Sequence, residues 1–122
     1  MSAPLKVFSL KVRKVGTSLA LTVPAEAVRR GIISEEGDIY VLVVMDKRGE
    51  RLILATQDEE TLFRAIWDWE GIYHISQNRI SKDSHNYHFI SVSKALEKAG
   101  WGEVEEVVTE LFDKFIIYRK KK

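Results

Sequence analysis

The side chains that could do chemistry in this sequence are basic and small polar residues gathered near two predicted turns. They are Lys11, Arg13, Lys14, Thr17 and Ser18 in one segment, and Arg79, Lys82, His85 and Asn86 in another. Lysine offers a point charge and arginine a forked donor to phosphate oxygens, while the short polar groups can reach base edges. Alternation along a strand places Lys11 and Arg13 on one face. These residues predict a nucleic-acid interface, with a solvated strand face as the alternative.

Metal and catalytic chemistry find less support in the residue pattern. His85 and His88 are three apart and His74 is distant, and no cysteine or close acid completes a ligand set. Ser84 and Asp83 adjoin His85 in sequence, but a catalytic triad requires convergence in space, and no nucleophile elbow or phosphate loop is present. With zero cysteines, disulfides and thiolate chemistry are excluded. We expect no enzyme, no metal site and no cofactor.

The overall composition is that of a folded domain. The chain has 122 residues, of which 45% are apolar and 30% charged, with only two prolines. These values predict one compact fold rather than disorder. No run of 18 apolar residues occurs, and the first ten residues hold too short an apolar stretch for a signal peptide. We therefore expect a cytoplasmic protein without a membrane segment.

Charge is distributed by segment, although the net charge is only +1. Residues 1–31 carry a balance of +5, residues 32–71 of −6, residues 72–102 of +2, and residues 103–122 of zero. Such a pattern suits a protein that turns a basic surface toward a polyanion. Ordinary solvated faces are the alternative.

The first half of the chain predicts the order β-β-α-β-β. Apolar and polar residues alternate over 8–12 and 19–23, with Gly16-Thr17 as the turn between two strands. Pro24 ends the second strand and starts a short helix over 25–30, which Gly31 closes. Two further strands are predicted over 39–45 and 51–55.

A helix over 57–70 is predicted to connect the two halves. Leu62, Phe63, Ile66 and Trp69 form one apolar stripe, and acids fill its first turn. We expect this stripe to cover a core, and we expect all three tryptophans, Trp67, Trp69 and Trp101, to be core residues. A partner-binding face is the alternative for the stripe.

After Gly71 the same order of elements begins again. Strands are predicted over 72–80 and 87–92, a helix over 94–99 closed by Gly100, and a hairpin from strands over 104–112 and 115–118. Aligning residues 18–31 with 87–100 gives 14 ungapped positions, of which two are identical and several others similar. The pattern predicts a tandem repeat.

The run from Arg13 to Pro24, followed by Gly31 and Gly37-Asp38, resembles the AbrB/SpoVT/MazE family of swapped-hairpin DNA-binding domains. The resemblance covers about residues 6–56. A second, degenerate copy covers about 72–119, in which Ser93 replaces the proline and the loop after Lys82 is longer and lacks glycine.

The resemblance implies a mainly β fold with short helices (α+β), in which two units exchange hairpins to make one barrel. The units are residues 1–56 and the degenerate copy 72–122, joined by a linker helix over 57–71. A lone unit of about 50 residues buries too little apolar surface to be stable, whereas the joined pair makes a normal small domain.

The function that the resemblance implies is double-stranded DNA binding by a nucleoid-associated transcriptional regulator. We expect the first copy to dominate affinity, because Asp83 beside Lys82 partly cancels the attraction to phosphate in the second. The closing residues 119–122 are either a phosphate contact or a frayed basic tail. The alternative function is an antitoxin-like or other protein-interaction module, with a protein partner bound on helix 58–70. Homodimerisation stays open.

Overall fold

The computed structural model describes residues 3–121 and contains, over that range, nine strands and three short helices. The strands are β1 (Lys6–Lys11), β2 (Arg13–Val15), β3 (Ser18–Val23), β4 (Asp38–Met45), β5 (Arg51–Thr56), β6 (Gly71–Lys82), β7 (His88–Ser91), β8 (Glu106–Leu111) and β9 (Phe115–Lys120). The helices are α1 (Ala25–Arg29), α2 (Glu59–Asp68) and α3 (Ser93–Ala99). The predicted mainly β fold with short helices is confirmed.

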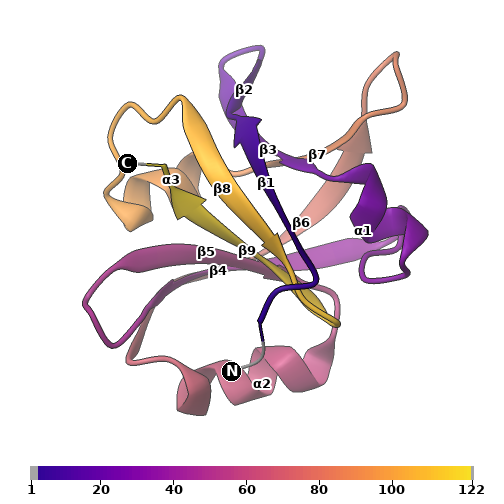
Figure 1. Cartoon of the computed structure of the whole chain (residues 1–122). Coiled ribbons are helices and arrows are strands. Elements are labelled where there is room, and N and C mark those ends of the chain that lie inside the picture. The colour runs from indigo at the N-terminus through magenta and orange to yellow at the C-terminus, as the bar shows by residue number, and fades with distance from the viewer. Residues whose placement is uncertain (1–2, 122) are drawn as a thin grey trace.

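The strands form one nearly closed antiparallel barrel (Figure 1). Their order is β1-β8-β9-β5-β4-β6-β7-β3-β2, so the two ends of the order are β1 and β2, which adjoin in sequence. The chain bends between them at Val12, whose backbone N–H donates to the Glu105 carbonyl at 2.8 Å. Because β1 pairs with β8 and β2 with β3, this bent strand joins the two edges of the sheet.

Strand β6 is the counterpart, in the second half, of the bent strand formed by β1 and β2 in the first. Its first part pairs with β4 and its last three residues pair with β7. The two halves occupy equivalent places in the barrel. If β1-β2 is exchanged with β6, β3 with β7, β4 with β8 and β5 with β9, every strand keeps the same neighbours. The halves meet at two like pairs, β3 with β7 and β5 with β9. Each half therefore inserts strands between those of the other.

The barrel interior is a single apolar core built from both halves. Leu21 and Ile53 from the first half pack in the same buried cluster as Ile90 and Ile116 from the second. Tyr118 is fully buried there, and its hydroxyl donates to the Thr22 carbonyl at 2.8 Å. Burial raises the pKa of this phenol, since the interior disfavours its charged form. Such interleaving lets two short units share the apolar burial that neither achieves alone.

Helix α2 lies across one end of the barrel (Figure 1). Ala65 is buried, and Leu62 and Trp69 pack against a second apolar cluster that includes Leu54 and Phe112. The expectation that the whole stripe covers a core is wrong in part. Helical spacing carries Phe63 and Ile66 away from this contact, and their side chains are 68% and 67% exposed.

The expected burial of the tryptophans is also corrected. Trp101 is buried, and its indole N–H donates to the Arg51 carbonyl at 3.0 Å. Trp67 is 84% exposed, because it lies on the side of α2 turned away from the barrel. Since Trp69 packs against the second cluster, the expectation is wrong for Trp67 only.

The start of α2 depends on a side-chain cap. Asp58 accepts hydrogen bonds from the Thr61 backbone N–H at 3.0 Å and the Thr61 hydroxyl at 2.7 Å. The Thr61 side chain and backbone hydrogen bonds hold the pKa of Asp58 below its usual range. The cap satisfies a backbone donor that the helix itself cannot.

Replacing Asp58 with alanine is expected to destabilise the protein by about 1 kcal/mol, the usual cost of losing an N-cap. Urea denaturation of D58A and of D58N at neutral pH measures the effect. The asparagine variant keeps a side-chain acceptor and should retain most of the stability. Equal stability of D58A and the native chain contradicts a role for the cap.

Candidate nucleic-acid interface

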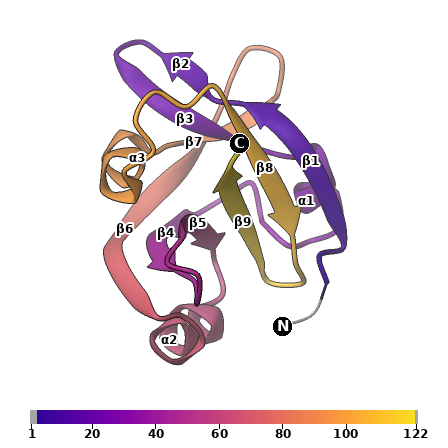
Figure 2. The same cartoon turned by 60° about the vertical axis from the view of Figure 1, so that its left-hand side comes forward.

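Two hairpin tips project from the end of the barrel opposite α2. They are the β2-β3 turn at Gly16-Thr17 and the β6-β7 loop over residues 83–87, and both lie at the top in Figures 1 and 2. The first tip turns on Gly16, whose φ of 64° is a conformation that favours glycine. The fold thus brings the two predicted groups of site residues to one end of the molecule.

Asp83 organises the second tip. Its Oδ1 accepts the backbone N–H of His85 at 2.9 Å and that of Tyr87 at 3.0 Å. Its own backbone N–H donates to the Tyr87 carbonyl at 3.0 Å, and Asn86 takes a left-handed conformation with a φ of 65°. Asparagine tolerates that conformation better than most residues, which explains how the loop turns without glycine.

Arg13 ties the two tips together. Its Nη2 donates to Asp83 Oδ2 at 2.7 Å, and the guanidinium carbon lies 4.8 Å from the centre of the Phe89 ring. Both side chains of the ion pair are largely shielded from solvent. Asp83 therefore neutralises an arginine of the first half rather than the neighbouring Lys82. This guanidinium acts as an internal brace in the unbound protein, which its sequence position did not indicate.

We expect Asp83→Ala to release the second tip, with faster amide hydrogen exchange at His85 and Tyr87, because both lose their acceptor. Asp83→Asn is the matched control, since it keeps an oxygen for those amides while losing the charge paired with Arg13. Exchange rates followed by NMR distinguish the variants. Unchanged exchange in D83A contradicts the assignment of Asp83 as the loop organiser.

The same contacts set the pH range in which the second tip is ordered. The Tyr87 backbone N–H, followed by the Arg13 side chain, holds the pKa of Asp83 below its ordinary value of 3.8. Because the pKa of Asp83 is lower in the folded protein, the stability that its ionised carboxylate adds is complete above pH 3.8. That stability is lost as the pH falls through the folded-state pKa. The His85 and Tyr87 amide shifts should therefore titrate with a midpoint below 3.8.

Much of the basic charge in residues 1–31 is paired within the chain. The Glu26 carboxylate forms ion pairs with Lys6 Nζ at 3.1 Å and with the guanidinium groups of Arg29 and Arg30, both at 3.4 Å. The Lys6 hydrogen bond and these neighbouring cations hold the pKa of Glu26 below its usual range. At this place the basic residues of the segment are therefore paired with an acid of the same chain. This agrees better with ordinary surface charges, the alternative interpretation, than with a surface for a polyanion.

Lys11 and Arg79 lie among acidic neighbours below the tips. Lys11 stands opposite Glu106 in the β1-β8 register. Lys11 and Lys14 both line a shallow hollow whose acids include Glu103 and Glu105. Arg79 is 4.0 Å from Asp38, with a side chain that is 91% exposed. These two residues are exposed as predicted, but the acids beside them reduce their attraction for phosphate.

The remaining predicted residues, apart from Ser18, form what we call the tip surface. Its members are Lys14, Thr17, Lys82, His85 and Asn86, all of them exposed. Among the described ion pairs, none involves Lys14 or Lys82. Ser18 lies half-buried at the start of β3. Tyr87 is 59% exposed on the second tip and was missed, although an aromatic residue in a polar loop is a usable signal.

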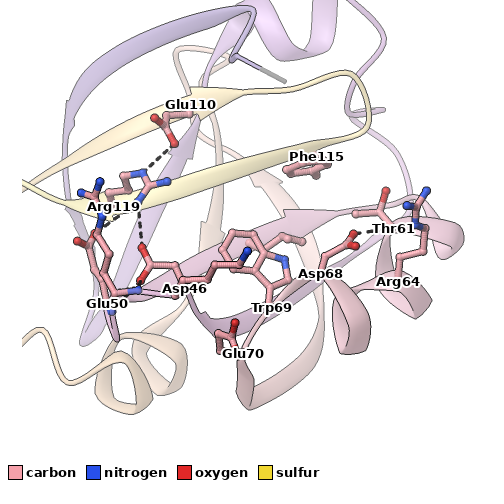
Figure 3. Close-up of a pocket in the computed structure, with 13 residues that line it drawn as sticks. Asp46, Glu50, Thr61, Arg64, Asp68, Trp69, Glu70, Glu110, Phe115 and Arg119 are labelled. Atoms are coloured by element: carbon pink, nitrogen blue, oxygen red, sulfur yellow. Dashed lines mark hydrogen bonds and ion pairs between the residues drawn. The ribbon is translucent and has the colours of Figure 1, made fainter. Parts of the chain in front are cut away.

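A further hollow lies elsewhere, between α2, the β4-β5 hairpin and strands β8 and β9 (Figure 3). It encloses about 780 Å³. Arg119 lies in it, 2.9 Å from Glu110, 3.6 Å from Glu50 and 3.9 Å from Asp46. Asp46 also accepts the Arg48 and Glu50 backbone N–H groups at 2.9 Å. The acids around Arg119 are thus already engaged with it.

Of the two alternatives for the closing residues, a phosphate contact or a frayed basic tail, the structure contradicts the frayed tail over residues 119–121. Arg119 and Lys120 belong to β9, and Lys121 donates to Glu106 at 2.8 Å and to Ser9 at 2.9 Å. Pairing with β8 holds this segment in place. Lys122, the last residue of the expected tail, lies outside the described residues.

Within residues 3–121, no three histidine, aspartate or glutamate side chains gather as metal ligands. No helix in that range is long and apolar enough to cross a membrane. Comparisons with protein-family models, curated proteins and solved structures find no match for this chain.

Proposed function

We propose that this protein binds double-stranded DNA through its tip surface and acts as a transcriptional regulator of the nucleoid. The observation that carries the proposal is the placement of Lys14 and Lys82, one from each half, which are exposed in the strands β2 and β6 that lead into the two tips. Ammonium groups without a carboxylate partner attract phosphate, and binding gains from the release of counterions.

The symmetric strand order supports the same proposal. Duplex DNA is itself close to two-fold symmetric, and proteins that bind it commonly present paired elements related by a two-fold axis. Here one chain supplies both elements, because its halves occupy equivalent places in the barrel. We accordingly infer a tandem pair of AbrB-like units, residues 1–56 and 72–122, joined by a linker over 57–71.

The chemistry of the tip surface divides between positioning and reading. Lys14 and Lys82 contact phosphates and fix the register, while Thr17, His85 and Asn86 offer hydrogen-bonding groups to base edges. Arg13 holds the two tips at a fixed separation through Asp83 rather than contacting DNA in the unbound geometry.

Fluorescence anisotropy with a labelled duplex at several salt concentrations tests the proposal. Binding should weaken steeply as salt rises, since each phosphate contact adds about 0.9 to the logarithmic slope. A single-stranded oligonucleotide of the same sequence is the control for duplex preference. The absence of binding to any duplex at low salt would overturn the proposed function.

A further inference from the structure

The apolar face of α2 that points away from the barrel is the most exposed apolar region of the described structure. Trp67 is 84% exposed, Phe63 68% and Ile66 67%, which are the three highest values among the large apolar side chains of residues 3–121. Their spacing of i, i+3 and i+4 gathers them on one side of the helix. We call these three residues the α2 face.

The α2 face is not needed to hold the helix in place. Leu62, Ala65 and Trp69 make the contacts with the barrel, and Asp58 caps the first turn. Soluble monomers rarely leave large adjacent apolar side chains in water without a role in binding. Tryptophan in particular is enriched among the residues that dominate binding energies.

The charge around the α2 face is acidic. Residues 58–70 hold five acids and one base. Glu59 and Glu60 lie one turn before Phe63, and neither takes part in a described ion pair, whereas Arg64 is 4.0 Å from Asp68. Opposite charges around an apolar centre favour correct partners and repel wrong ones.

This charge decides between possible occupants. A second copy would bring two acidic helices together, which like-charge repulsion opposes. The three side chains offer on the order of 400 Å² at typical aromatic and aliphatic areas, about half of a standard interface side. Nucleic acid and anionic lipid are repelled by the same acids.

We propose that the α2 face docks an amphipathic segment of a partner protein, with apolar anchors flanked by lysine or arginine. An amphipathic segment lying along apolar side chains at helical spacing is a recurring mode of peptide recognition. Helix α2 lies at the end of the barrel away from the hairpin tips (Figure 2), so docking on it leaves the tip surface free.

Two labelled synthetic peptides test the proposal on the full-length protein by anisotropy. Both carry the same leucine face, and their polar positions are lysine in one and glutamate in the other. The lysine peptide should bind with micromolar affinity, and the glutamate peptide at least tenfold more weakly. Binding of the lysine peptide should be accompanied by a blue shift of tryptophan emission, as Trp67 leaves water.

Two variants assign the binding to the α2 face. The triple change F63S/I66S/W67S should weaken binding of the lysine peptide at least tenfold. The control L5S/V7S alters exposed apolar residues of the N-terminal segment and should leave the affinity for this peptide unchanged. The charge reversal E59K/E60K should reverse the preference between the two peptides. This second variant keeps the test decisive if the triple change disturbs folding.

Other outcomes overturn the proposal. Equal binding of both peptides, or binding of neither, removes the assigned partner chemistry. A native dimer in sedimentation equilibrium that F63S/I66S/W67S converts to a monomer identifies a second copy as the occupant. A blue shift on zwitterionic phosphatidylcholine vesicles, abolished in the same variant, identifies a lipid surface.

Discussion

The double change Lys14→Ala with Lys82→Ala is expected to weaken DNA binding by roughly 30-fold at moderate salt. Each contact between an exposed ammonium and a phosphate contributes about 1 kcal/mol, and 1.4 kcal/mol is a factor of ten. The logarithmic salt slope should fall in magnitude by about two, because two phosphate contacts are lost. Both side chains are exposed, so folding should be unaffected.

The matched control for this prediction is Lys47→Ala with Lys114→Ala. Both lysines are exposed and lie in the β4-β5 and β8-β9 turns, away from the hairpin tips, and the change in net charge is the same. Anisotropy titrations of the two double variants separate a local contact from a general charge effect. Equal losses in both variants contradict the assignment of the tip surface.

Replacing Leu21 with alanine is expected to destabilise the protein by about 2–5 kcal/mol, the range for buried leucines whose removal leaves a cavity. Leu21 is fully buried in the cluster that also contains Ile90 and Ile116. Because this cluster is shared, the whole barrel should unfold in one transition. Backbone amides of β8 and β9 should lose hydrogen-exchange protection together with those of β3.

Leu5→Ala makes the same chemical change at a half-exposed position and serves as the control. Its effect should stay within about 0.5 kcal/mol, as for most surface substitutions. Chemical denaturation followed by circular dichroism gives both values. Two separate transitions in L21A, with β8 and β9 still protected after β3 has opened, contradict a shared core.

The strands and helices could be predicted from the sequence because local rules govern them. Alternating side chains along residues 19–23 identified β3. Gly100, with a φ of 69°, ends α3 at the residue that the sequence predicted. The ends were less well placed, since helix 57–70 was reduced to Glu59–Asp68 by the Asp58 cap and an extended Trp69.

The candidate site was predicted in part. The sequence identified Lys14 and Lys82 as basic residues near turns, and both are exposed. It could not predict that Arg13 binds Asp83, 70 residues further along the chain. That pairing depends on β3 lying beside β7, which no local pattern encodes.

Sequence alone thus determined the elements, the turns and the places where basic residues gather, because each depends on neighbours within a few positions. The tertiary structure alone decided which charged side chains form ion pairs within the molecule and which apolar residues face water. Lys6 is paired with Glu26 and Arg119 with Glu50, acids well separated from them in the sequence, and Trp67 points outward from a helix whose other side meets the barrel. Apolar residues lie on two sides of α2, so only the position of the barrel decides which of those sides is buried.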